Sequence, residues 1–171
     1  IMHDLETLGG TNSYGWGLND SGRVVGESDI TGDSASHAFY YDGTMHDLGT
    51  LGGTSSIAFN INELGQAVGG SDLAGDMSYH AFLYEDSTMN DLGTLGGTAS
   101  YAEGINDNGQ VVGNSYITGD SANHAFLFDD GNMIDLYNLL IDGSGWALTY
   151  AYDINHIGQI VGQGSINGET H

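Results

Sequence analysis

The feature that most constrains the fold is a repeat that runs through the whole chain. Met-x-Asp-Leu begins at Met2, Met45, Met89 and Met133, so the period is 43 or 44 residues. Such a period is typical of proteins whose repeats stack to bury a shared core. We therefore predict one repeat domain over residues 1–171. Its repeats are approximately 2–44, 45–88, 89–132 and 133–171, and the last is incomplete.

Each repeat contains four short runs with strand character. In the second repeat they are Ile57–Asn62, Gln66–Gly70, Ala81–Tyr84 and Met89–Leu92. Asn-x-x-Gly, as at Asn62–Gly65, suits a type I turn that closes with glycine in the left-handed region, so the first two runs should form a hairpin. Short acidic or glycine-containing turns join the last two runs in the same way.

Two longer connections complete the unit, and both are predicted as loops. Gly26–Ser36 links the second run to the third, and Gly49–Ser56 leads into the next repeat. Four antiparallel strands followed by a crossover are typical of a β-propeller blade. We therefore predict an all-β, β-propeller-like array of four repeats. A β-solenoid and an open stack of β-sheets are the alternatives. Ile1–Leu5 resembles a fourth strand and could close the ring by completing the last repeat.

Charge limits the possible partners of this chain. It carries 23 Asp and Glu against one basic residue, Arg23, for a net charge of −22. So negative a surface repels nucleic acid and anionic membranes, which we exclude as partners. The sequence also has no apolar run of the roughly 20 residues that a membrane span needs. With no cysteine there is no disulfide framework and no cysteine nucleophile.

The predicted second-to-third loops carry a possible cation site. Two of them read Asp-x-x-Gly-Asp, and the third keeps only its second Asp. Carboxylates with a nearby glycine turn offer the hard oxygen ligands that Ca²⁺ takes, although the spacing is not that of an EF-hand. The candidate ligands are Asp29, Asp33, Asp72, Asp76 and Asp120. A solvated acidic loop is the alternative interpretation.

Other recurring residues favour structural roles. The aspartates of Met-x-Asp-Leu should hydrogen-bond strand-end amides or a neighbouring histidine. They are Asp4, Asp47, Asp91 and Asp135. One His-Ala-Phe histidine per repeat indicates packed, hydrogen-bonded side chains and not a metal cluster. These histidines are His37, His80 and His124. The sequon at Asn19–Ser21 sits in a tight turn and is a weak glycosylation signal.

Aromatic residues near the entries to the first strands could stack on sugars, with packing between repeats as the more ordinary alternative. They are Tyr14, Trp16, Tyr101, Trp146, Tyr150 and Tyr152. No recognisable nucleophile and base accompany them.

The chain resembles the bacterial extracellular HAF-repeat family. The resemblance rests on His-Ala-Phe together with Asp-Leu-Gly-Thr-Leu-Gly-Gly-Thr at Asp47–Thr54 and Asp91–Thr98, and on the hairpin sequence Ile105–Gly113. The final unit, Asp135–Trp146, is similar to the variant with which such proteins tend to end. The resemblance implies a secreted or cell-surface protein and no particular activity.

These observations favour a non-enzymatic extracellular structural or surface protein, which the acidic loops predict to be stabilised by calcium. An unpaired strand edge attracts other strands, so we expect head-to-tail self-association into a filament, ring or matrix. The alternative is a lectin-like module that binds extracellular glycans, and a glycan-active enzyme is the third possibility.

Overall fold

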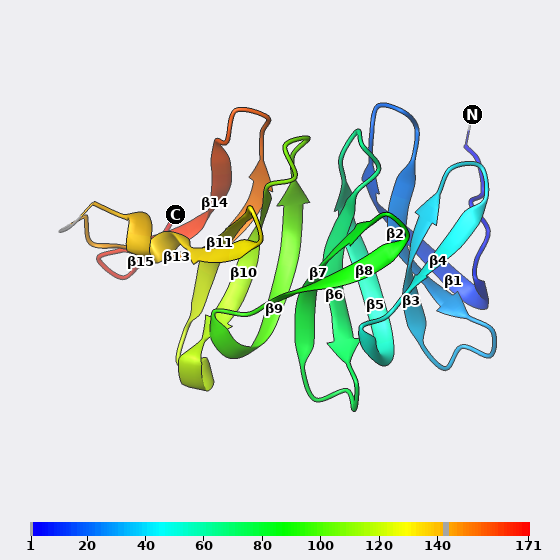
Figure 1. Cartoon of the computed structure of the whole chain (residues 1–171), viewed down its shortest axis with the longest axis horizontal. Helices are drawn as coiled ribbons and strands as arrows, with labels where there is room; N and C mark the ends of the chain where they lie inside the picture. The colour runs from blue at the N-terminus through cyan, green and yellow to red at the C-terminus, as the bar shows by residue number, and fades with distance from the viewer. Residues whose placement is uncertain (1, 142–143) are drawn as a thin grey trace.

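The computed structural model describes residues 2–141 and 144–171, and within them it contains strands, turns and two short 3₁₀ segments but no α-helix. The all-β prediction is therefore confirmed. The strands form several sheets, and none of them closes on itself (Figure 1).

Consecutive strands pair in antiparallel sets, which we call units. The first unit has β1 (Gly9–Leu18), β2 (Val24–Ile30), β3 (Ser36–Tyr41) and β4 (Met45–Gly49). The second has β5 (Gly52–Ile61), β6 (Ala67–Leu73), β7 (Tyr79–Glu85) and β8 (Thr88–Gly93). The third has β9 (Gly96–Ile105), β10 (Val111–Ile117), β11 (Asn123–Asp129) and β12 (Asn132–Asp135). The last has β13 (Trp146–Ile154), β14 (Ile160–Ile166) and the short β15 (Glu169–Thr170).

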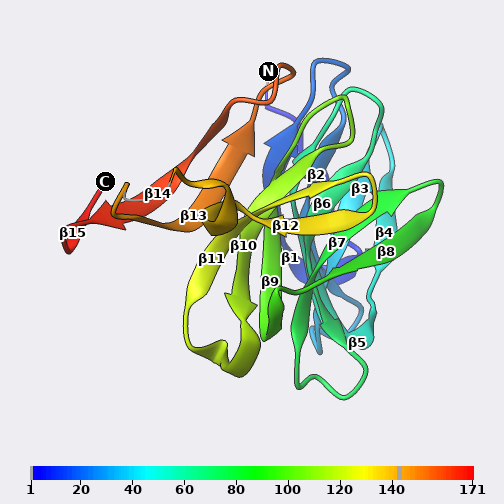
Figure 2. The same cartoon turned by 60° about the vertical axis from the view of Figure 1, so that its left-hand side comes forward.

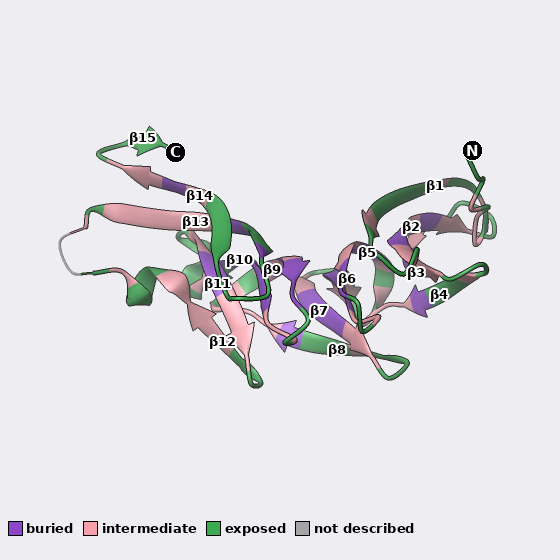
Figure 3. Cartoon of the chain, turned by 90° about the horizontal axis from the view of Figure 1, so that it is seen from above, coloured by how far each residue is buried: buried purple, intermediate pink, exposed green. Residues whose placement is uncertain are grey.

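Two-residue connections join the first unit to the second and the second unit to the third, whereas residues 136–145 join the third unit to the last. One parallel bridge, between Tyr79 and Ala99, links the second and third units into an eight-stranded sheet. The 3₁₀ segments are η1 (Thr118–Asp120) and η2 (Leu136–Leu139). Figure 3 shows the units along an arc; in the first three, β1, β5 and β9 lie toward its inner side and β4, β8 and β12 toward its outer side.

The predicted runs correspond to observed strands, and the predicted turn is confirmed. Gly65 donates its N–H to the carbonyl of Asn62 at 3.1 Å, and the equivalent glycines of the other units make the same hydrogen bond at 3.0 Å. The φ of Gly65 is +86°. Only a residue without a side chain adopts that φ at little cost, so glycine recurs at the end of Asn-x-x-Gly.

The two predicted loops are mostly strand, which corrects the sequence interpretation. β2 continues to Ile30, so the Gly26–Ser36 connection is reduced to a tight turn. β5 already begins at Gly52, inside the predicted Gly49–Ser56 connection. A β-carbon on Gly53 would lie 2.4 Å from the carbonyl oxygen of Leu73. The glycines of Leu-Gly-Gly-Thr therefore allow two strand backbones to approach closely. Because glycine is also common in loops, the sequence was interpreted as a loop.

Neighbouring units bury their apolar faces against each other. One cluster joins Val25, Ala38 and Leu48 of the first unit to Ala58, Ile61, Ala67 and Phe82 of the second. Equivalent clusters lie between the second and third units and between the third and last units. Each unit therefore has a forward face, which packs on the next unit, and a backward face, which packs on the preceding one.

A second-strand glycine fixes the register within every unit. It is Gly26, Gly69, Gly113 or Gly162. A β-carbon on Gly69 would lie 1.9 Å from the carbonyl oxygen of Ile57, where the pairing of β5 with β6 shifts register between Ala58 and Asn60. Any side chain at this position would force the two strands apart. This explains why glycine follows valine at the same place in β2, β6, β10 and β14.

The predicted closure by Ile1–Leu5 is not present. Residues 2–7 form no strand, Ile1 lies outside the described residues, and the start of the chain is at the end of the array opposite β13–β15 (Figure 1). A fourth strand needs a third strand as its hydrogen-bonding neighbour, and the residues near Met2 have none in the first unit, where β4 already occupies that edge.

Candidate functional site

The candidate calcium ligands fall into two places in each unit. Asp33, Asp76 and Asp120 occupy the turn after the second strand, with φ of +54°, +54° and +52°. Their carboxylates receive hydrogen bonds from Thr11, Thr54 and Thr98, respectively. In the second unit Thr54 donates its N–H at 2.7 Å and its hydroxyl at 2.5 Å to the two oxygens of Asp76. Each turn aspartate thus ties its hairpin to the first strand.

Asp29 and Asp72 lie within β2 and β6 and not in loops. Asp29 accepts hydrogen bonds from the Ser36 hydroxyl at 2.8 Å and from the side-chain amide of Asn12 at 2.8 Å. These hydrogen bonds lower the pKa of Asp29. A β-carbon on Gly10 would contact both Asp29 and Asp33, so the two carboxylates flank the same glycine.

The five acids are therefore brought together in pairs, one pair per unit, with Asp120 alone in the third. Among residues 2–141 and 144–171, no three His, Asp or Glu side chains are grouped in a way that could hold a metal ion. The carboxylates accept hydrogen bonds from protein donors but keep further lone pairs. Calcium binding stays a prediction.

Three of the recurring aspartates pair with the recurring histidines, as the sequence predicted, and Asp4 accepts the N–H of Glu6. His37 and Asp47 approach to 2.9 Å between Nδ1 and Oδ2, and His80–Asp91 and His124–Asp135 repeat the contact at 2.9 and 2.8 Å. The aspartates also accept a strand-end N–H; for Asp47 the donor is Gly49, at 2.7 Å. These residues fasten the third strand to the fourth within one unit, so they do not form a common site.

The aromatic residues divide into packed ones and stacked pairs that are at least partly exposed: Tyr14, Trp16 and Tyr152 are exposed, and Tyr150 is half-buried. Tyr14 and Trp16 stack with centroids 6.4 Å apart, and Tyr150 and Tyr152 with centroids 6.0 Å apart. Tyr101 instead stacks on Tyr79 of the preceding unit at 4.8 Å. Burial raises the pKa of both Tyr79 and Tyr101. The packing alternative therefore holds for Tyr101, and the exposed pairs remain available as stacking surfaces.

The forward face of the last unit is uncovered. Val25, Val68 and Val112, each just before the second-strand glycine, are fully buried beneath the next unit. Their counterpart in the last unit, Val161, is 62% exposed, and the neighbouring Ile160 is 36% exposed. The same residue type at the same place in the unit is thus core in three units and surface in the fourth.

The backward face of the first unit is uncovered in the same way. The last residue of each first strand is Leu18, Ile61, Ile105 or Ile154. The three isoleucines are buried against the preceding unit, whereas Leu18 is 68% exposed. The two uncovered faces lie at opposite ends of the array (Figure 1).

A ladder of asparagines continues from unit to unit beside these faces. The side-chain amide of Asn19 donates to the carbonyl of Asn62, Asn62 donates to that of Asn106, and Asn106 to that of Asn155, each at 3.0 Å. Among the residues that the structure describes, the side-chain amide of Asn155 donates to Gln159 of its own hairpin and to no other unit. Because Asn19 is buried in this ladder, the Asn19–Ser21 sequon is not accessible for glycosylation.

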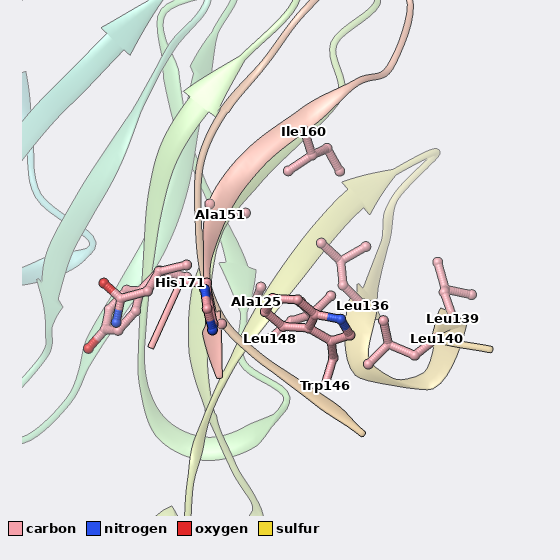
Figure 4. A pocket seen from close by; sticks show the side chains of 13 residues that line it. Ala125, Leu136, Leu139, Leu140, Trp146, Leu148, Ala151, Ile160 and His171 are labelled. Atoms are coloured by element: carbon pink, nitrogen blue, oxygen red, sulfur yellow. The ribbon is translucent and has the colours of Figure 1, made fainter. Parts of the chain in front are cut away.

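A cavity of about 500 Å³ lies between the third unit and the last. Figure 4 shows Trp146 on one side of it, beside Leu136, Leu139 and Leu140 from the segment around η2. The sequence did not predict this cavity, because its walls come from segments of two units. The variant sequence around Leu136–Trp146 was the one available signal.

No known family model matches this chain, and no curated protein is detectably similar to it. In the part of the chain that the structure describes, no helix has the length and apolar character required to cross a bilayer.

Proposed function

We propose that this chain is a non-enzymatic structural protein of the cell exterior, related to HAF-repeat proteins, that assembles head to tail. The observation that carries the proposal is the pair of uncovered faces, Val161 at one end and Leu18 at the other. A forward face packs on a backward face three times inside the molecule. The uncovered forward face of one copy could therefore pack on the uncovered backward face of the next.

The joint would repeat an interface that the sequence already encodes. Val161 of one copy would meet the backward face of the next, and Leu18 would be buried as Ile61 is. Asn155 would donate to the carbonyl of Asn19, which extends the asparagine ladder across the joint. A contact between two different faces is heterologous, so repetition gives a filament or a closed ring and not a two-fold dimer.

The curved arrangement of the units supports a propeller-like architecture as part of this proposal. First strands on the inner side and fourth strands on the outer side are the arrangement of propeller blades. Four units that leave an open arc could be completed by units of another copy. The net charge of −22 opposes association, so salt or Ca²⁺ bound at the Asp33 and Asp76 turns would favour it.

The test uses one blocking variant for each face. Leu18→Asp and Val161→Asp should each be monomeric in analytical ultracentrifugation, because each removes one half of the joint. Mixed together they should form a 1:1 dimer and nothing larger, since one intact face of each kind remains. Leu64→Asp adds the same charge to an exposed turn residue and should assemble like the unmodified chain. A monomeric unmodified chain would contradict the proposal.

Residues 1–5 provide a second test of the joint. Met2 is almost fully exposed, and we predict that this segment adds to the edge of the neighbour's last sheet. Deleting residues 1–5 should shorten the assemblies seen by electron microscopy. Polymers that persist unchanged would show that the faces alone make the joint.

The second candidate function is glycan binding, and the exposed aromatic pairs favour it. Tyr14–Trp16 and Tyr150–Tyr152 present adjacent rings on the first strands, as sugar-stacking surfaces do. Binding to a glycan array that survives in the monomeric Val161→Asp variant and is lost in Trp16→Ala would favour this function over a purely structural one.

A further inference from the structure

We propose that a cavity between the second and third units binds an arginine side chain of a basic partner polypeptide. The cavity has a volume of about 340 Å³ and lies between the β7–β8 hairpin and the β11–β12 hairpin. Figure 2 shows these two hairpins on the same side of the array. Each of the two units packs on a neighbour on both of its sides, so the site depends neither on the end faces nor on head-to-tail assembly.

Apolar side chains form the floor of this cavity, and carboxylates surround it. Leu83 and Leu92 are buried, and Phe128 is half-buried. The carboxylates in its lining are those of Glu85, Asp91, Asp129 and Asp130. Glu85 and Asp129 each accept a hydrogen bond from a glutamine amide of their own unit, at 2.8 and 3.1 Å. A carboxylate has two oxygens with several lone pairs, so both can accept from a further donor.

The equivalent place between the first and second units already holds a guanidinium. Arg23 ends the turn of the first unit as Gln66 ends that of the second. A β-carbon on Gly65, in the turn of the second unit, would lie 2.7 Å from Nη1 of Arg23. A β-carbon on Gly109, at the same place in the third unit, would meet no atom within 4 Å. The space that Arg23 fills beside Gly65 is therefore open beside Gly109, which lines the cavity.

Two further differences between the first and second units enlarge this space. In the first unit the guanidinium of Arg23 lies 6.0 Å from the ring centroid of Tyr40, and that ring lies 6.0 Å from the ring of His46. Tyr40 pairs with His46 across the third and fourth strands, as Leu83 pairs with Asn90 in the second unit. Leu83 and Asn90 have no rings, and both line the cavity. The comparison indicates that a guanidinium fits this place and that the second unit does not supply one.

The chemistry of the lining favours a guanidinium over other cations. In the described ranges, 2–141 and 144–171, no three His, Asp or Glu side chains are grouped as metal ligands would be. A guanidinium is planar, weakly hydrated and carries five N–H donors, so it can lie against Phe128 while it donates to several carboxylates. The ammonium group of lysine is compact and more strongly hydrated, so it gains less beside an apolar floor.

Charge indicates where the arginine comes from. Arg23 is the one Lys or Arg among the 171 residues and already lies in the first of the two places, so a second copy of this sequence offers no free arginine. A net charge of −22 attracts basic polypeptides and steers them to the protein. We therefore assign the cavity to an arginine of such a partner.

The probe is the blocked peptide acetyl-Gly-Arg-Gly-amide, titrated into the Leu18→Asp chain and followed by NMR. Saturable shifts should appear at the amides of Asn90, Gly109 and Gly131, which line the cavity. The same peptide with citrulline, a neutral side chain of nearly the same shape, should bind at least about tenfold more weakly, because its hydrogen bonds are no longer charge-assisted. The lysine peptide should bind at least about threefold more weakly, although its charge is the same.

Two pairs of variants locate the site. Gln66→Arg supplies a guanidinium from within the chain and should abolish binding, whereas Gln159→Arg adds the same charge at the equivalent place of the last unit and should not. Asp130→Asn, in an exposed turn, should weaken binding by at least about threefold, as loss of a partly exposed ion pair does. Asp86→Asn removes the same charge from the corresponding turn of the second unit and should change affinity by less than about 1.5-fold. Melting curves confirm that each variant is folded.

Three results would overturn the proposal. Equal affinity for the arginine and lysine peptides, or shifts spread over all units, would show general attraction to a negative surface. Unchanged binding in folded Gln66→Arg or in Asp130→Asn would place the peptide elsewhere. Tighter binding of free L-arginine than of the blocked peptide would assign the cavity to a small molecule and not to a polypeptide.

Discussion

The second and last units carry the same local sequence in different surroundings. Both contain Asn-x-x-Gly-Gln, an apolar pair and glycine, and both fold the first two strands into the same bulged hairpin. Yet Val68 is completely buried and Val161 is mostly exposed. The hairpin is thus specified locally, whereas burial depends on whether another unit covers the forward face. The uncovered face of the last unit is an interior surface without its neighbour.

The largest expected difference in stability between the two units results from placing an aspartate at the same position of each. Val68→Asp buries an unpaired carboxylate and should destabilise folding by more than about 4 kcal/mol. Val161→Asp should change stability by less than about 0.5 kcal/mol and block association. Chemical denaturation of both variants, at a concentration where the chain is monomeric, measures the difference. Similar losses would mean that Val161 is covered in solution.

The backward faces of the first two units allow the same comparison with a smaller change, the truncation of an apolar side chain to alanine. Ile61→Ala removes a side chain buried between the first two units and should cost about 2 to 4 kcal/mol. Leu18→Ala, at the matching place in the first unit, should cost less than about 0.5 kcal/mol in the monomer. If the Leu18→Ala loss grows with protein concentration, its burial in the joint is supported; a loss that is independent of concentration speaks against it.

The dependence of the melting temperature on cations tests whether the turns of the first and second units bind Ca²⁺ or are only screened by salt. If the Asp33 and Asp76 turns bind Ca²⁺ only in the folded state, Ca²⁺ should raise the melting temperature more than Na⁺ at equal ionic strength. Asp33→Asn and Asp76→Asn should reduce that increment. Thr54→Val removes the hydroxyl donor to Asp76 but keeps the acid, so it controls for loss of the hydrogen bond alone. Identical melts in Ca²⁺ and EDTA would leave only screening.

The smallest expected effect concerns a half-buried acid of the third unit, at a place where the other three units have aromatic residues. Burial raises the pKa of Glu103, whose counterparts in β1, β5 and β13 are Trp16, Phe59 and Tyr152. A carboxyl with a raised folded pKa destabilises the folded state above that pKa, so stability should increase as the pH falls toward the unfolded value of 4.5.

Glu103→Gln removes this titration. It should stabilise the protein at pH 7 by less than about 1 kcal/mol, and the gain over the unmodified chain should disappear below the unfolded pKa. Denaturation at several pH values measures it. A gain that persists unchanged in acid would trace to packing and not to the carboxylate.

Much of the local structure was predictable from the sequence, because it depends on residues close together in the chain. The all-β class and the Asn62–Gly65 turn follow from alternating apolar residues and from glycine with a positive φ. The pairing of His80 with Asp91 was predictable as one of two hydrogen-bonding roles for a recurring acid. The sequence alone could not show whether Asp29 and Asp72 are metal ligands, because that interpretation assumed a loop where the chain continues as a strand.

The sequence by itself therefore determined the period, the strands and the turns, since these rest on backbone preferences within one hairpin. Only the tertiary structure decided that the strand begins at Gly52, because the close approach of Gly53 to Leu73 is what makes glycine necessary in this segment. It alone decided that identical valines are core in one unit and surface in another, and that Ala125 and Leu136 line a cavity. Burial is a property of the surface that faces a residue, and here that surface belongs to a neighbouring unit more than 40 residues away in the chain.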